Sequence, residues 1–450
     1  MPSIRSVAIR SFLLLSMGGC AAAPPSLGDA GELAADLEAL LAARADAVAT
    51  ARRSGDPWDL WAACLESSAP AVLAARRELL IAQARARSLG APQSMVDAEH
   101  VGSGADRDSE LMIALDLPGL VGAGRAGATR ARAEVDAARA EEALAAAGFT
   151  TQHALERSLA SLAVARELER HLAELEESCG ANDKRLELLA GRGWLPPDQV
   201  AVARTMLHHV AVMRLEQQAA VAAARASVAS ASGLPPSSPW LDDAETTGLA
   251  AISRRTMGRA DRPDPSARDL LDGHPELRLA RFDYLGAEAD VRVACAQRWP
   301  ALLIGPKATL TVDDLLWGGV LRLELPWPPA ADAAVDEARA ARDQTHDALV
   351  AALARAQNEI VRRRAEQQAA DVALREHGEG VAESSARAFR AAQARFAADV
   401  AAIPEWSMAI DQRARALTAR AAALERWLVA TFDLSEALGP TKDGGEEGAR

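Results

Sequence analysis

The sequence ERSLASLAVARELERHLAELEESCGANDKRLELLA, residues 156–190, lies within a run without proline that extends from residue 119 to residue 195. The run is rich in Ala, Arg, Glu and Leu, which favour α-helix. Held mostly as one helix with a rise of 1.5 Å per residue, it would reach roughly 100 Å. A compact domain cannot enclose such a helix, so we expect it to pack along neighbouring long helices.

A turn signal ends this run, and a second helix returns from it. Residues 191–198, GRGWLPPD, contain two glycines and two prolines, and a helical pattern follows from about residue 198 to residue 232. Residues 233–236, GLPP, place glycine before proline, which is typical of a helix exit. The pattern predicts a pair of long antiparallel helices.

The same plan occurs a second time in the chain. The motif LDLP at residues 115–118 precedes the first long run, and LELP at 323–326 precedes another proline-free run, residues 330–403. Pro404 interrupts that run, and a returning helix ends at residues 437–440, ALGP. The two motifs, like the two helix exits, are roughly 200 residues apart, which indicates an internal duplication.

Alternating apolar residues before each long run predict β-strands. Residues 321–325, LRLEL, alternate cleanly, and residues 111–117 show a similar pattern. With weaker candidates upstream, they predict one β-hairpin in each half, at about residues 93–117 and 301–325. We expect short strands of about eight residues, with Pro306 and Lys307 interrupting one of them.

A helical segment precedes each hairpin, at residues 70–88 and from His274-Pro275-Glu276-Leu277 to about residue 297. The predicted fold class is mainly α with a small β part, in two structural repeats. The expected organisation is a signal peptide at 1–19, a first repeat at 20–233 with long helices at 119–232, a linker at 234–272, a second repeat at 273–439 with long helices at 330–438, and a disordered tail at 440–450.

Composition narrows the class of function. The 450-residue chain has a net charge of −13 and only 4% aromatic residues, and it lacks the basic patch with aromatic platforms that nucleic-acid binding requires. No Walker sequence, dinucleotide loop or nucleophile elbow is present. His208 and His209 point in different directions on a helix, and Cys64, Cys179 and Cys295 lack metal-ligand spacing. We therefore expect no enzyme, no cofactor and no metal site.

The N-terminus carries a candidate targeting signal. Arg5 and Arg10 precede the short apolar segment 12–17, and Gly18-Gly19-Cys20 follows. This looks like a bacterial lipoprotein signal with lipidation at Cys20, and Ala21 after it suggests the outer membrane by resemblance to lipoprotein sorting rules. The alternative is an ordinary signal peptide with an incidental cysteine.

The order of these elements resembles the outer-membrane efflux protein family, the TolC-like channel-tunnels, in its lipoprotein branch. The resemblance rests on Pro118 and Pro326 before the long runs, on the opening at residues 274–277 and on the helix ends. It implies a homotrimer with an α-helical barrel in the periplasm. Because a hairpin with open edges cannot exist alone in lipid, four strands from each of three chains would close a 12-stranded membrane β-barrel.

The resemblance also implies roles for the turns between long and returning helices, at residues 191–198 and about 398–406. Acidic side chains near such tips narrow the entrance in relatives, which points to Glu405 and Asp198 as gate residues; Met408 occupies the other matching position. The alternative for both acids is a helix N-cap or first-turn residue that stabilises the helix dipole. Arg192 and Gly193 resemble tip residues that contact an adaptor protein.

The expected function is the channel-tunnel of a tripartite efflux or type I secretion system, a passive exit duct. Its expected partners are a periplasmic adaptor protein, an inner-membrane pump and outer-membrane lipid, without nucleic acid. The alternative is a lipid-anchored periplasmic scaffold of the same fold without a working pore, motivated by the short strands and the scarcity of aromatic residues.

Overall fold

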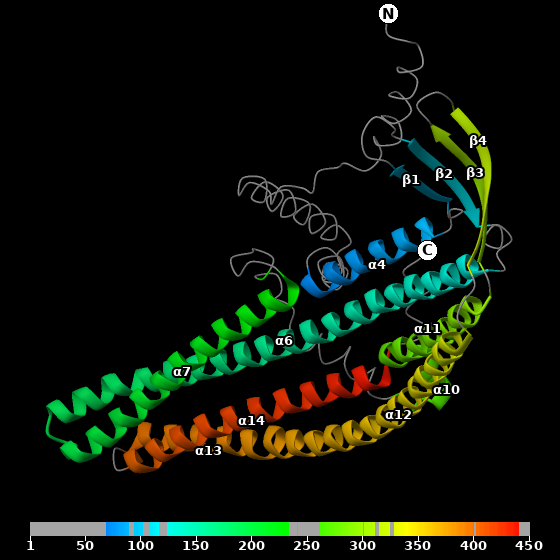
Figure 1. Cartoon of the computed structure of the whole chain (residues 1–450). Coiled ribbons are helices and arrows are strands. Elements are labelled where there is room, and N and C mark those ends of the chain that lie inside the picture. The colour runs from blue at the N-terminus through cyan, green and yellow to red at the C-terminus, as the bar shows by residue number, and fades with distance from the viewer. Residues whose placement is uncertain are drawn as a thin grey trace, which may run out of the picture. The chain divides into compact units, whose positions relative to one another are not determined.

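The computed structural model of the protein is mainly helical, with one small sheet (Figure 1). It describes residues 69–89, 94–101, 108–116, 124–233, 241, 262–299, 301–310, 315–324, 328–399 and 402–440. The expected signal peptide, the lipidation site Cys20, the residues Pro118 and Pro326, and the tail after residue 440 lie outside the described residues.

The first half contains three described helices, α4 (Pro70–Ser88), α6 (Arg125–Gly191) and α7 (Pro197–Ser232). Helix α6 is a single helix of 67 residues, and α4 and α7 both pack against it. Helix α7 returns along α6 and ends at Gly233, whose φ of 69° places it in the left-handed region that favours glycine. The long first helix and its returning partner are therefore present.

The second half contains α10 (Ala267–Gly273), α11 (Pro275–Gln297), α12 (Pro328–Arg375), the π-helical segment η1 (Glu376–Val381), α13 (Ala382–Ala398) and α14 (Ile403–Leu438). The proline-free run at residues 330–403 is thus not one continuous α-helix: η1 divides it, and α13 ends at Ala398. π-Helical turns are rare and occur mostly as a single wide turn inside an α-helix.

The sheet has the strand order β1-β2-β3-β4, with antiparallel neighbours: β1 (Ser94–Val101), β2 (Asp108–Asp116), β3 (Ala301–Leu310) and β4 (Leu315–Glu324). The predicted interruption at Pro306 and Lys307 is wrong, because they pair with Gly319 and Gly318 of β4. Strand β3 also pairs with β2. The described pairs of that ladder include Met112↔Lys307 and Leu115↔Ile304 but none between them, so Pro306, which lacks an N–H, lies where β2 forms no described pair with β3. Strands β3 and β4, with 10 residues each, are longer than expected.

Two buried clusters hold the helices together. The first, which we call the tip core, joins α6, α7, α13 and α14 near the two turns. The second, the proximal core, joins α10, α11, α12 and the end of α14 through residues Leu270, Leu277, Ile360, Leu434, Ala437 and Leu438. The tip core draws on helices of both halves, and α6 also packs against α11 and α14, so the two halves form one packed helical unit.

Across the described residues, none of the helices combines the length and the apolar character that crossing a membrane would need.

Candidate functional site

The first tip, residues 191–198, is a tight turn between α6 and α7. Gly193 has a φ of +68°, and its N–H donates to the carbonyl of Ala190 at 2.9 Å. The N–H of Trp194 donates to the carbonyl of Leu189 at 3.1 Å, and the buried Leu195 anchors the turn in the tip core. Arg192 and Gly193 are therefore exposed at the end of a rigid turn, where a glycine is needed for the backbone conformation.

An exposed tryptophan lies in the same turn. Trp194 is 65% exposed, and the guanidinium carbon of Arg192 lies 5.4 Å from the centre of its ring. Leu188, at the end of α6, is also more than half exposed. Arg192 and Gly193 were predicted at this tip but Trp194 was not, although a tryptophan in a polar turn is a signal visible in the sequence. The first tip thus presents a cationic and an apolar group side by side.

Asp198 lies in the first turn of α7 and is exposed. The N-cap position belongs to Pro196, so the capping alternative is wrong for Asp198, whereas the first-turn alternative matches its position. A carboxylate there interacts favourably with the positive end of the helix dipole. This position is also open to solvent, so the acid is available to an ion or a partner.

The second tip, residues 398–406, connects α13 to α14. Glu405 lies in the first turn of α14, and its N-cap is Ala402, so the capping alternative is wrong here too. The carboxylate of Glu405 forms an ion pair of 2.8 Å with Arg395 of α13, and both side chains are largely exposed. Met408 is 63% exposed and lines, with these two residues, a shallow groove between α13 and α14. Arg395, which was not predicted as a site residue, partly neutralises the charge of the predicted gate residue Glu405.

A stacked aromatic pair connects the two helices of the second tip and contacts helix α6 of the first half. Trp406 is fully buried, and its ring stacks on Phe396 with centroids 4.9 Å apart. The guanidinium carbon of Arg185, from α6, lies 5.3 Å from the centre of the Phe396 ring. Gln393 of α13 donates to the carbonyl of Ser178 of α6 at 3.4 Å. The structure therefore brings both tips to the same end of one four-helix bundle (Figure 1).

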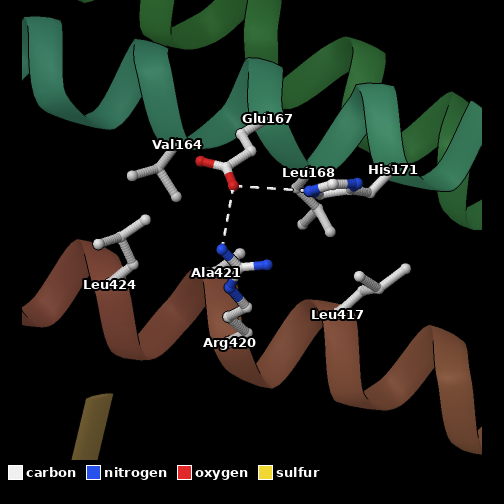
Figure 2. Close-up of a pocket in the computed structure, with 8 residues that line it drawn as sticks. All are labelled: Val164, Glu167, Leu168, His171, Leu417, Arg420, Ala421 and Leu424. Atoms are coloured by element: carbon white, nitrogen blue, oxygen red, sulfur yellow. Dashed lines mark hydrogen bonds and ion pairs between the residues drawn. The ribbon is translucent and has the colours of Figure 1, made fainter. Parts of the chain in front are cut away.

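Farther from the tips, a charged contact joins α6 to α14 (Figure 2). Glu167 of α6 lies between His171 of the same helix, at 3.5 Å, and Arg420 of α14, at 3.4 Å. The hydrogen bond from His171 and the charge of Arg420 lower the pKa of the Glu167 carboxyl, against the opposing effect of burial. Apolar side chains such as Leu168 and Leu417 surround the contact. It is one of the polar contacts between α6 and α14.

A third contact between the halves lies near the proximal core. Arg157 of α6 forms ion pairs with Asp433, at 2.7 Å, and with Glu436, both on α14. Arg363 of α12 also pairs with Asp433, whose side chain is only 13% exposed. These contacts line a cavity beside His274, whose pKa is lowered by burial. Charged contacts thus join α6 to α14 at more than one level along the bundle.

The described residues contain no group of three or more His, Cys, Asp or Glu side chains placed to hold a metal ion. His208 and His209 are both exposed on α7.

No protein-family model and no curated protein matches this chain. Its structure is nevertheless similar to solved outer-membrane proteins. The outer-membrane channel OprN has 17% sequence identity and a TM-score of 0.69, with 86% of this chain and 90% of that chain covered. For the CmeC outer membrane channel of Campylobacter jejuni the identity is 14%, the TM-score 0.68 and the coverage 85% and 86%. For the open state of the MtrE outer membrane channel of Neisseria gonorrhoeae they are 17%, 0.62, 84% and 88%.

At these identities the likeness establishes the fold. The resemblance drawn from the sequence is confirmed at that level: the chain has the mainly helical fold of the TolC-like outer-membrane channels, in a divergent sequence.

Proposed function

We propose that this chain, which has the fold of the TolC-like outer-membrane channels, is the passive exit duct of a tripartite efflux system or a type I secretion system. Three copies assemble, an adaptor protein and an inner-membrane pump dock at the tips, and solutes leave through a water-filled lumen. One observation carries the proposal: two tips from distant parts of the sequence lie at one end of a single bundle and share one core.

Exposed apolar faces on the long helices support assembly with further copies. On α12, Val350, Val361 and Val372 are each more than half exposed. Their spacing of 11 residues places them on one face of the helix. Helix α7 also exposes Val202 and Leu215 as single apolar side chains. Neighbouring copies would bury these faces, as an amphipathic helix requires.

The tips supply the entrance and the docking surface in this proposal. The Glu405 and Asp198 carboxylates, both exposed, would favour cations where the three copies converge. Arg192, Gly193 and the exposed Trp194 would contact the adaptor, because a large aromatic ring beside an arginine is typical of residues that dominate protein interfaces.

The sheet and the N-terminus would hold the assembly in the outer membrane. Strands β1 and β4 are the edges of the four-stranded sheet, and pairing these edges between three copies would close a 12-stranded barrel. Cleavage after residue 19 and lipidation of Cys20 would add a lipid anchor to this barrel.

The test is the mass and the heat-sensitive gel mobility of the detergent-extracted protein, with and without Cys20→Ala. We expect a heat-dissociable trimer that stays in the membrane without its lipid and gives ion conductance in a planar bilayer. Release of the Cys20→Ala variant from the membrane would instead favour the lipid-anchored scaffold without a pore. A correctly assembled trimer that never conducts would contradict the duct.

A further inference from the structure

The π-helical segment η1 distinguishes the second long helix from the first. At its end the N–H of Ala382 donates to the carbonyl of His377, five residues earlier, in place of the α-helical partner. Helix α6 runs for 67 residues as α-helix, although Gly148 and Gly180 lie within it. A glycine in a long helix is therefore not enough to produce such a turn in this protein, and η1 needs its own explanation.

The two described glycines of η1 make the helix more flexible, but neither its backbone conformation nor its packing requires glycine at these positions. Neither Gly378 nor Gly380 has a positive φ. A Cβ atom at Gly380 would meet nothing within 4 Å, and one at Gly378 would only touch the end of Leu374 at 4.0 Å. Packing and backbone conformation would both accept alanine. What glycine supplies here is flexibility, at a cost of about 1 kcal/mol per residue in a helix.

Two serines weaken the helix just after the π-turn. The hydroxyl of Ser384 donates to the carbonyl of Val381 at 3.0 Å, and that of Ser385 donates to the carbonyl of Ala382 at 2.8 Å. Serine hydroxyls that bond back to the preceding turn compete with the backbone N–H groups and bend helices. Glycines, a wide turn and back-bonding serines thus fall in one short stretch.

Burial along the second long helix is also interrupted at this stretch. Ile360 of α12 belongs to the proximal core, whereas Phe389 and Phe396 of α13 belong to the tip core. Between Ile360 and Ala382, no described side chain of the helix is buried. The segments on either side of η1 are therefore held by different cores, with a weakly packed stretch between them.

Arg413 of α14 binds the backbone directly after η1, at the start of α13. Its Nη1 atom donates to the carbonyl of Ala382 at 2.6 Å and to the hydroxyl of Ser385 at 3.2 Å. Among the described residues no carboxylate forms an ion pair with Arg413, and burial together with repulsion from Arg420 and Arg390 lowers its pKa. A partly buried charge that forms no ion pair is costly, and the bond to the carbonyl of Ala382 offsets part of this cost.

We propose that η1 is a hinge in the second long helix and that Arg413, on the carbonyl of Ala382, is the latch that holds it. Release of the latch lets α13, which carries Arg395 and Phe396 of the second tip, move separately from α12. The use of this motion to open the entrance rests on the proposed function. The hinge itself does not, so its test measures the motion directly.

The experiment is amide hydrogen exchange, read by mass spectrometry, on the full chain in detergent. The variant Arg413→Met removes the donor and keeps a long side chain. We expect peptides covering residues 376–390 to exchange about tenfold faster, as loss of a hydrogen bond from a charged donor implies. The matched control is Arg415→Met, because Arg415 lies on the same helix but pairs with Asp411 in solvent.

A second variant changes the hinge in the opposite direction. The double substitution Gly378→Ala and Gly380→Ala fits the space available and should slow exchange in the same peptides about fivefold. Unchanged exchange in both variants would overturn the proposal. So would equal acceleration in peptides from α6 and α7, because that would show general destabilisation. Conductance does not enter this test, so a failed hinge and a failed duct are told apart.

Discussion

The ring of Trp406 stacks on the ring of Phe396 with an interplanar angle of 15°, and this contact connects the two helices of the second tip. Both side chains are fully buried, and Arg185 from the first half lies over the phenylalanine. The tip is therefore held by a specific packed core, in which the few aromatic residues of the chain contribute large buried surfaces.

Truncation of the buried tryptophan should destabilise the tip. We expect Trp406→Ala to lower the free energy of unfolding by about 3–5 kcal/mol, because it removes a large side chain and leaves a cavity. Trp194→Ala is the matched control, since that ring is mostly exposed, and should cost less than about 0.5 kcal/mol. Denaturant unfolding followed by circular dichroism measures both values. Equal losses would contradict the packing described here.

Removing either partner of the Arg395–Glu405 ion pair should change the ion selectivity of the proposed entrance, and the two changes should have opposite signs. If the chain forms the proposed duct, Arg395→Gln frees the Glu405 carboxylate and should raise the preference for cations. Glu405→Gln should lower it. Reversal potentials in planar bilayers under a salt gradient measure the preference. Shifts of the same sign for both variants would exclude a role for this pair in selectivity.

The contact shown in Figure 2 should make stability depend on pH. The pKa of Glu167 is lowered below its ordinary value of 4.5, so its carboxylate stabilises the folded state above that pH. The contribution is lost as the pH falls through the lower folded pKa. Glu167→Gln should therefore cost about 1 kcal/mol at pH 7 and nothing once the carboxyl is protonated. Unfolding curves at several pH values test this, with the exposed Glu177→Gln on the same helix as control.

The two described cysteines should differ in reactivity. Cys179 is 1% exposed, and burial raises the pKa of its thiol to about 11, whereas Cys295 is partly exposed. Because the thiolate is the reactive form, iodoacetamide at pH 8 should modify Cys295 well before Cys179. Peptide mass spectrometry measures each rate, and labelling in urea should remove the difference. Fast modification of Cys179 in the folded protein would show that the tip core opens readily.

The exposed valine face of α12 should control assembly more than folding. Val361 is 67% exposed, so Val361→Glu should change the stability of the single chain by less than about 0.5 kcal/mol. In a trimer the same carboxylate would be buried against a neighbour, and assembly should fail. Native mass spectrometry in detergent reads the outcome, with Val361→Thr as the variant of similar shape. A trimer that tolerates the glutamate would place the interface on another face.

Much of the architecture could be predicted from local signals. Proline-free runs, glycine followed by proline and strand alternation indicated the long helices, their returns and the strands, because backbone propensity and apolar periodicity act over a few residues. Local rules failed at Pro306, because whether a strand tolerates a proline depends on whether the neighbouring strand needs the missing N–H for a hydrogen bond. They also failed at η1, where the contact with Arg413 comes from another helix.

The sequence by itself determined the long helices, their returning partners and the two turns with Arg192, Gly193, Asp198 and Glu405. Only the tertiary structure decided that these turns share one core and that Arg395 faces Glu405. It also decided that Arg185 from the first half covers an aromatic ring of the second. The reason is physical: the position of an element depends on its own residues, whereas contacts between distant elements depend on how their surfaces pack.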